Sequence, residues 1–178
     1  MIVFDLETTG LPKAEGSDLN MQPKIIEFGA IRLTDGNLEE YDRLEFMCNP
    51  GHELDPKITK ITGISDDHLK EEKPFVAYYN DLCNFFLGEK IMVAHNLPFD
   101  RKILRFELER LDKVTKFPWP MEHICTVEVG QNVWGKMRKL GDIYEEIMGK
   151  KIDGAHRSLN DVEATIEIIK WYKKEGHI

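Results

Sequence analysis

The chain has 178 residues, of which 42% are hydrophobic and 31% are charged, the mixture of an ordinary globular protein. We expect one domain over residues 1–178, because this length can bury a substantial core and no repeat or linker interrupts it. The formal net charge of −8 excludes attraction of nucleic acid by the molecule as a whole, so such a partner would need local basic patches. The three cysteines are odd in number and lack metal-site spacing, which predicts reduced thiols in a cytoplasmic protein. No secretory signal or bilayer-spanning run is recognised, so we expect no membrane partner.

The N-terminal segment combines a buried strand with two acids. Ile2 to Phe4 form an apolar run, Asp5 and Glu7 follow, and Gly10-Leu-Pro12 ends the strand. Residues two apart in a strand point to the same face, so the two carboxylates are predicted to lie side by side. Two like charges about 4 Å apart repel by roughly 4 kcal/mol at an effective dielectric near 20. A hard divalent cation would offset this repulsion, and a solvated pair at a strand end is the alternative interpretation.

Two more strands are predicted directly after a polar loop. Ile25–Leu33 has strand composition, and Asp35-Gly36 is a hairpin turn signal. Leu38–Cys48 then returns as a further strand. The first three strands are therefore expected to form an antiparallel meander.

The remainder of the chain is mainly helical in its pattern. The predicted helices cover residues 55–61, a turn from 65, then 75–87, about 98–111, 125–133, 140–148 and the segment from about 158 onward. One more buried strand is predicted at 91–94. This order of elements predicts an α/β fold with a mixed sheet covered by helices.

Further acids and a histidine lie at predicted element ends. Asp100 begins the helix that follows the strand at 91–94, and His156 and Asp161 flank the start of the last helix. Acids favour helix N-termini because of the helix dipole, and Ser158 with Asp161 resembles a capping arrangement. Each acid alone therefore has a purely structural explanation.

Taken together, these segments resemble the motifs of a known enzyme family. Phe4–Gly10, Asn96–Asp100 and His156–Asp161 are similar, in order and spacing, to the three motifs of the DEDDh, or DnaQ-like, 3′→5′ exonucleases. Asn49–Ile64 resembles the connecting segment of the proofreading members, such as polymerase epsilon subunits. The resemblance covers nearly the whole chain. It implies a ribonuclease H-like fold, a mixed five-stranded sheet with three antiparallel strands first, flanked by α-helices.

The resemblance also implies the catalytic groups. The expected ligands of two Mg²⁺ or Mn²⁺ ions are Asp5, Glu7, Asp100 and Asp161. His156 would be the general base, and its spacing from Asp161 is that of the histidine subtype. An imidazole with an ordinary pKa of roughly 6.5 suits proton abstraction near neutral pH.

Substrate contacts are expected beside these acids. The predicted contacts of the terminal nucleotide are Thr8, Thr9, Leu11, Asn96 and Arg157. Further candidates for phosphate contacts are Arg101, Lys102, Arg105, Lys136, Arg138, Lys139, Lys150 and Lys151, although such side chains on helices are usually just solvated. Trp119 and Trp134 could stack on bases, but packing within the protein is the preferred interpretation.

The predicted function is a metal-dependent 3′→5′ exonuclease that releases nucleoside 5′-monophosphates from single-stranded DNA ends by two-metal-ion hydrolysis. The alternative is an exoribonuclease that acts on short RNA or RNA ends. A non-catalytic nucleic-acid- or polymerase-binding module is disfavoured because all five motif residues are present, and the dense acidic loop of a calcium-binding protein is missing. The expected partners are 3′ ends of single-stranded DNA or RNA and, for proofreading, a DNA polymerase. Because the sequence ends soon after its last helix, we expect a free-standing enzyme or a domain of a longer protein.

Overall fold

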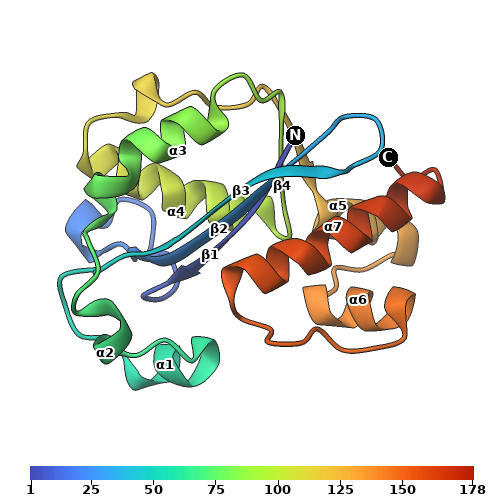
Figure 1. The fold of residues 1–178 in the computed structure, drawn as a ribbon. Helices are drawn as coiled ribbons and strands as arrows, with labels where there is room; N and C mark the ends of the chain where they lie inside the picture. The colour runs from blue at the N-terminus through green and yellow to red at the C-terminus, as the bar shows by residue number, and fades with distance from the viewer.

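A computed structural model describes residues 1–178 and contains one five-stranded sheet with helices on both faces (Figure 1). The strands are β1 (Ile2–Thr8), β2 (Ile25–Leu33), β3 (Glu40–Met47), β4 (Ile91–Ala94) and β5 (Glu122–Cys125). The α-helices are α1 (Pro56–Thr62), α2 (Asp66–Leu69), α3 (Tyr79–Phe86), α4 (Leu97–Arg110), α5 (Thr126–Trp134), α6 (Leu140–Met148) and α7 (Ser158–Lys174). Short 3₁₀ turns lie at Leu19–Met21, Phe75–Tyr78 and Val114–Lys116.

The sheet has the order β3-β2-β1-β4-β5, so the first strand is central. β2 is antiparallel to both β1 and β3, whereas β4 is parallel to β1 and β5. This confirms the predicted α/β class and the ribonuclease H-like mixed sheet with its antiparallel meander. The carboxyl ends of the parallel strands meet at one edge, where open α/β sheets bind their ligands.

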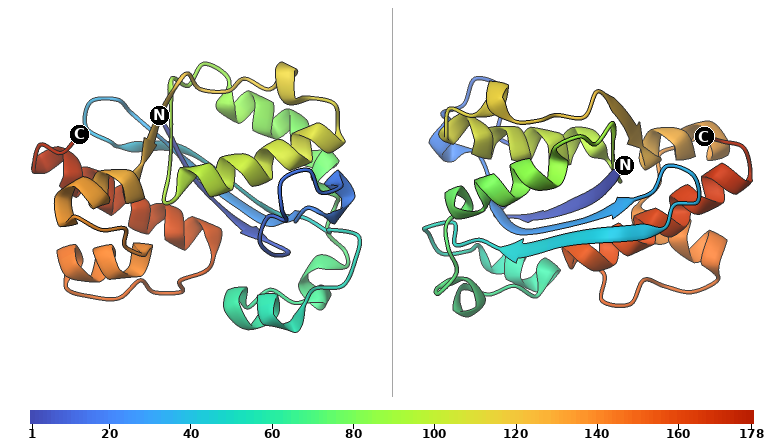
Figure 2. Two further views of the ribbon diagram at one scale, coloured as in Figure 1. Left: turned by 180° about the vertical axis from the view of Figure 1, so that it is seen from behind. Right: turned by 45° about the horizontal axis from the view of Figure 1, so that its top comes forward.

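β1 separates two hydrophobic cores. Ile2, Phe4 and Leu6 belong to the larger core, which α3 and α4 cover. Val3 belongs to a second core with residues of α7 on the opposite face. Figure 2 (right) shows the two layers of helices on either side of the sheet. Because side chains alternate along a strand, Asp5 shares the α7 face with Val3.

Most predicted elements are confirmed. The strands at 25–33 and 91–94 and the helix at 140–148 coincide with β2, β4 and α6. The helix predicted from residue 55 is α1, whose N-cap is Asp55 and whose C-cap is Gly63 in the left-handed conformation. The segment at 75–87 starts as a 3₁₀ turn and continues as α3.

The residue patterns do not locate the fifth strand that the resemblance implies, and they begin a helix at Cys125 instead. The structure places β5 at Glu122–Cys125 and starts α5 at Thr126. The first three residues of β5 are not buried, so no apolar run or alternation marks them as a strand. Hydrogen bonding to β4 makes this segment a strand.

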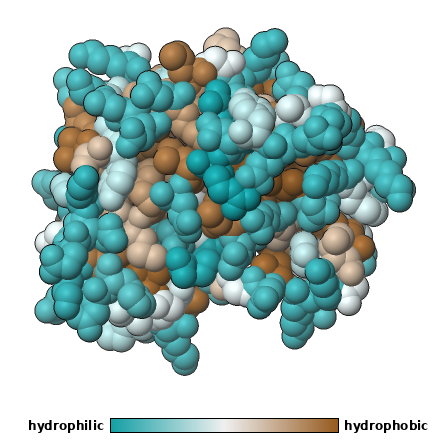
Figure 3. Space-filling view, in the orientation of Figure 1, coloured by the Kyte–Doolittle hydropathy of each residue, from teal (hydrophilic) through white to brown (hydrophobic).

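The face of the molecule seen in Figure 3 is covered mainly by hydrophilic side chains, with hydrophobic ones visible between them. None of the helices combines the length and the apolar character that crossing a membrane requires. Cys48, Cys83 and Cys125 form no disulfide, as predicted.

Candidate active site

Three elements bring the predicted acids to one edge of the sheet. Asp5 and Glu7 are carried by β1, Asp100 lies in the first turn of α4, and Asp161 lies in the first turn of α7. The carboxyl group of Asp5 is within electrostatic reach of the other three, since each of them raises its pKa. The structure therefore brings all four predicted metal ligands together.

Burial and mutual repulsion disfavour full ionisation of this group. Burial, followed by the neighbouring carboxylates, raises the pKa of Asp5 well above its ordinary value. The same causes raise the pKa of Glu7 to about 8. Burial also raises the pKa values of Asp100 and Asp161. A positive charge at this edge would favour the ionised forms, so the site is electrostatically suited to a cation.

The donor set fits a divalent metal ion. Glu7, His156 and Asp161 each offer a ligand atom, and these atoms lie within 4.8 Å of one another. The Oδ1 atom of Asp161 is buried without a hydrogen-bond partner, while its Oδ2 atom accepts from the backbone N–H of His156 at 3.2 Å. A buried carboxylate oxygen normally has a partner, and hard cations such as Mg²⁺ prefer oxygen ligands. The residues present therefore fit the metal that the resemblance implies.

His156 lies in an exposed loop directly before α7. Its φ of 65° is in the left-handed region, which is uncommon for residues other than glycine. Its side chain lines a cleft of about 770 Å³, together with Asn96 and Asp161. An exposed imidazole beside buried carboxylates can exchange a proton with a molecule bound in this cleft.

Glu27 of β2 is a fifth carboxylate at this edge, and it is not among the predicted site residues. It is fully buried and lies opposite Glu7 in the β1–β2 register. It accepts hydrogen bonds from the Nε (2.9 Å) and Nη2 (2.6 Å) atoms of Arg157 and from the backbone N–H of Ser158 (2.8 Å). Since Arg157 directly follows His156, these bonds hold the histidine loop and the start of α7 against the sheet. A glutamate inside the apolar run at residues 25–28 is the signal that could have indicated such a role.

His95 is a second polar group of the site that is not among the predicted site residues. It lines the cleft and is partly buried, and burial lowers its pKa to about 4. Its Nδ1 atom lies 2.8 Å from the hydroxyl oxygen of Thr126, and its Nε2 atom lies 3.1 Å from the carbonyl oxygen of Arg138. A neutral ring satisfies both contacts by donating to the carbonyl and accepting from the hydroxyl. His95 thus ties the end of β4 to the far wall of the cleft.

Of the predicted nucleotide contacts, only Asn96 lines the cleft, whereas Thr8, Thr9 and Leu11 follow Glu7 in the chain and Arg157 follows His156. The hydroxyl of Thr8 donates to the carbonyl of Gly10 at 2.8 Å, and the hydroxyl of Thr9 accepts from the backbone N–H of Lys24 at 3.0 Å. These two threonines shape the turn after β1. Leu11 is 76% exposed. Their contacts with a substrate remain predictions, as do those of Asn96, whose side chain caps nothing, and of Arg157, which Glu27 already holds.

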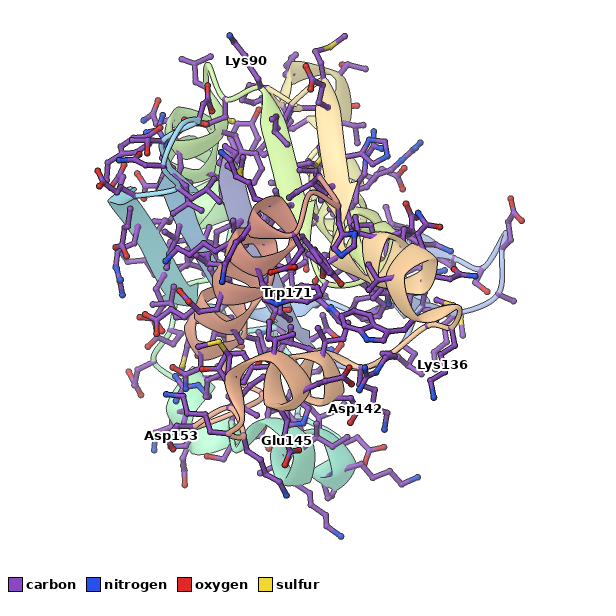
Figure 4. All side chains as sticks on the ribbon, turned by 90° about the vertical axis from the view of Figure 1, so that its right-hand side faces the viewer. Lys90, Lys136, Asp142, Glu145, Asp153 and Trp171 are labelled. Atoms are coloured by element: carbon purple, nitrogen blue, oxygen red, sulfur yellow. The ribbon has the colours of Figure 1, made fainter.

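The predicted phosphate contacts fall into groups. Those that line the cleft are Arg138, Lys139 and Lys151; those that line a groove along α4 are Arg101, Lys102 and Arg105; Lys136 and Lys150 line neither. The Arg138 guanidinium already binds Glu146 and lies 5.0 Å from the Trp134 ring. Figure 4 shows Lys136 beside α6, whose Asp142 and Glu145 also line the cleft.

The two tryptophans pack within the protein, as the preferred interpretation predicts. Trp134 stacks on Trp171 of α7 with ring centroids 5.7 Å apart. Trp119 packs edge-on against Phe117 at 4.8 Å, and its Nε1 atom donates to the carbonyl of Val114 at 3.1 Å.

Comparison with protein families and curated sequences gives matches along nearly the whole chain. The family model described as exonuclease (RNase T) matches residues 2–169. The chain is 33% identical over 181 residues to the DNA polymerase III PolC-type of Streptococcus pyogenes. It is 34% identical over 177 residues to the DNA polymerase III PolC-type of Streptococcus pneumoniae. Each alignment covers 98% of this chain but only 11% of the polymerase, so the chain spans a small part of these curated relatives.

Solved structures share the fold. The nuclease domain of 3′hExo, a DEDDh family member bound to rAMP, superposes with a TM-score of 0.78 at 21% identity, over 98% of this chain and 92% of that one. The complex of Escherichia coli ExoI with single-stranded DNA gives a TM-score of 0.78 at 19% identity, over 98% of this chain and 40% of that one. The resemblance that the motifs indicate is thereby confirmed.

Proposed function

Since this chain belongs to the DEDDh, or DnaQ-like, family of 3′→5′ exonucleases, we propose that it shortens single-stranded DNA from the 3′ end. Enzymes of this class hydrolyse phosphodiester bonds, and the proposed products are nucleoside 5′-monophosphates. Residues 1–178 act in this proposal as one exonuclease domain. The observation that carries it is the convergence of four buried or partly buried carboxylates and one exposed histidine at the carboxyl edge of β1.

The carboxylates form the metal-binding part of the site. Asp5, Glu7, Asp100 and Asp161 would hold two divalent ions, Mg²⁺ or Mn²⁺. When bound, such a pair stabilises negative charge on both the attacking and the leaving oxygen of a phosphodiester. The unpartnered Oδ1 atom of Asp161 and the raised pKa of Glu7 support this assignment.

His156 acts as the general base in this proposal. Its ring is exposed in the cleft and close to Glu7 and Asp161, so a ring nitrogen can accept the proton of the attacking water. The hydrogen bonds of Glu27 with Arg157 and Ser158 hold the loop that carries the imidazole. His156 would therefore present its ring from a loop attached to the sheet.

The residues around the cleft would bind the terminal nucleotide. Lys139 and Lys151 line the cleft and form no ion pair, so they are available for a phosphate. Leu11 offers an exposed apolar surface for a base, next to the turn that Thr8 and Thr9 shape. Asn96, at the opposite wall, has a free side-chain amide for a polar contact.

DNA is preferred over RNA as the proposed substrate because relatives at 33% and 34% identity are DNA polymerases III. The same relatives suggest a DNA polymerase as the partner and proofreading as the context. The alternative substrate is the 3′ end of RNA, and a nuclease assay distinguishes DNA from RNA as the substrate.

The test is a nuclease assay on DNA and RNA oligonucleotides of one sequence, each with a free 3′ end, a blocked 3′ end or a blocked 5′ end. With Mg²⁺ or Mn²⁺, we expect 5′-mononucleotides from single-stranded DNA and no digestion when the 3′ end is blocked. Asp5→Asn should abolish the release, whereas Asp67→Asn, an exposed acid on α2, should not change it. Digestion of 3′-blocked strands would overturn the polarity. Faster digestion of RNA would favour the exoribonuclease, and full activity of the Asp5→Asn protein would refute the assigned site.

A further inference from the structure

A second hollow, which we call the α4 groove, lies on the outer side of α4. It has a volume of about 970 Å³ and is bounded by α4, by the loop of residues 13–22 and by the segment 114–119. The left view of Figure 2 shows this loop beside α4. The groove contains none of the four carboxylates or the histidine of the candidate active site.

The α4 groove carries positive charge in an acidic protein. Lys13, Arg101 and Lys102 line it, are exposed, and form no ion pair. The other charged lining residues largely cancel, because Arg105 binds Glu109 at 2.8 Å and only Glu15 remains. A net charge of −8 disfavours the binding of polyanions to most of the surface. A local excess of cations therefore marks a place where a polyanion can bind.

Aromatic rings underlie two of these cations. The guanidinium of Arg101 lies 5.6 Å from the ring centre of Trp119, and the ammonium of Lys102 lies 5.9 Å from that of Phe106. Trp119 is itself held by a hydrogen bond of its Nε1 atom to the carbonyl of Val114. Cation–π contacts orient side chains that would otherwise be mobile, so the charges are arranged along the groove. Positive grooves with aromatic side chains are the usual track for single-stranded nucleic acid.

Residues that line the α4 groove lie close in sequence to residues of the active site. Asn96 lines the cleft and Pro98 lines the α4 groove, so the first turn of α4 separates them. Asp100 is buried against β1, whereas the next two residues of the helix, Arg101 and Lys102, are exposed in the groove. Lys13, on the other wall, follows closely after β1 in sequence. Both walls of the groove are thus continuations of elements that supply metal ligands.

We propose that the α4 groove binds the sugar–phosphate backbone of the strand on the 5′ side of the nucleotide being removed. This inference rests on the proposed function, because it assumes that the 3′ end lies in the cleft. Lys13, Arg101 and Lys102 contact phosphates, and Trp119 supports the cation above it. The contacts are independent of base identity, since they involve only the backbone.

The test compares a long substrate with a very small one. The Arg101→Gln/Lys102→Gln protein is assayed on a 20-nucleotide single strand and on the p-nitrophenyl ester of thymidine 5′-monophosphate. We expect KM for the long strand to rise about tenfold, with KM and kcat for the ester unchanged. The slope of log KM against log salt concentration should become less steep by about 1.4, since each lost phosphate contact accounts for about 0.7 with single strands.

The matched control is Lys90→Gln/Lys174→Gln, which removes the same charge elsewhere. Lys90 precedes β4 and lies at the end of the molecule away from α6, and Lys174 ends α7 (Figure 4). This protein should keep the wild-type KM and salt slope on both substrates. If the Arg101→Gln/Lys102→Gln protein had the same KM for the long strand as the wild type, the proposal would be wrong. The α4 groove would then fit an acidic protein partner instead. If the wild type hydrolyses neither substrate, the proposed function itself is wrong, and the two failures are thereby distinguished.

Discussion

The two helices that each supply one carboxylate to the site do so from different surroundings. Asp100 of α4 is 2% exposed, and the same helix places Ile103, Leu104 and Leu108 in the larger core. Asp161 of α7 is 8% exposed and has one oxygen without a partner. The loop before α7, residues 149–157, is exposed along most of its length.

The two sides of the site are held by different interactions. The α4 side is held by apolar packing, which needs no ion to form. On the α7 side, Val162, Ile166 and Ile169 pack in the second core. The start of this helix and the loop before it are held in addition by polar contacts, mainly those of Glu27 with Arg157 and Ser158 and the bond from His156 to Asp161. Polar substitutions should therefore disturb the α7 side more than the α4 side.

The largest expected effect comes from removing either carboxylate charge. Asp100→Asn and Asp161→Asn should each lower kcat by about 10³-fold, on the order of 4 kcal/mol of transition-state stabilisation. Without metal, both should raise Tm, because the neutral amide replaces an acid whose charged form is disfavoured by burial. The increase should be larger for Asp100→Asn, which is the more buried position. A variant that retains a tenth of the wild-type activity would show that its carboxylate is not a metal ligand.

The next prediction distinguishes the role of a residue in backbone conformation from its role in catalysis. Asn96, before α4, and His156, before α7, both have left-handed φ values, 67° and 65°. Glycine tolerates this conformation, so Asn96→Gly and His156→Gly should change stability by only about 1 kcal/mol or less. The rate of hydrolysis should fall about 10²- to 10⁴-fold for His156→Gly. For Asn96→Gly, activity should fall only a few-fold, through a higher KM. Added imidazole should partly restore the rate of His156→Gly; similar losses in both variants would instead point to a shared structural role.

The ion pair on the α7 side should respond asymmetrically to removal of its partners. Glu27 is fully buried, whereas the side chain of Arg157 is 44% exposed. Arg157→Gln leaves a buried charge unpaired and should cost about 3–5 kcal/mol in the free energy of unfolding. Glu27→Gln leaves only a half-exposed guanidinium and should cost less, about 1–2 kcal/mol. Urea denaturation measures both, and a smaller cost for Arg157→Gln would contradict the assigned geometry.

A further expected effect is a dependence of metal-free stability on pH. Burial raises the pKa of Glu7 from its ordinary 4.5 to about 8, so the folded state binds more protons than the unfolded state between these values. Stability without metal should therefore fall as pH rises through this window. Mg²⁺ favours the ionised carboxylates, so the gain in Tm on adding it should grow over the same range.

Thermal unfolding with and without Mg²⁺ from pH 5 to pH 8 measures this dependence. Glu7→Gln should flatten the metal-free profile, while Glu71→Gln, an exposed glutamate, should leave it unchanged. A gain in Tm that is equal at both ends of the range would rule out proton competition at Glu7.

Local patterns predicted the parts of the site that depend on neighbouring residues. Strand alternation placed Asp5 and Glu7 on one face, and the helix start signals placed Asp100 and Asp161 in first turns. That the helices meet β1 at one edge came from the family resemblance, because no local pattern relates positions about a hundred residues apart.

For the same reason, the role of Glu27 could not be predicted from the residues next to it in sequence. Its partner Arg157 follows 130 positions later, and the contact exists only after α7 has packed on the sheet. In sequence, the residue is only a charge within an otherwise apolar strand. β5 is a similar case, since its conformation is determined by its pairing with β4 and not by its own composition.

Gly29 of β2 lies opposite Asp5, at the point where α7 touches the sheet. A Cβ atom there would lie 2.6 Å from the Oγ atom of Ser158 and 2.8 Å from the backbone nitrogen of Leu159. The start of α7 therefore lies directly against the main chain of β2, at a position where only glycine leaves room for it. Amino-acid changes can accumulate in both cores while this spacing persists, which is a source of mutational robustness.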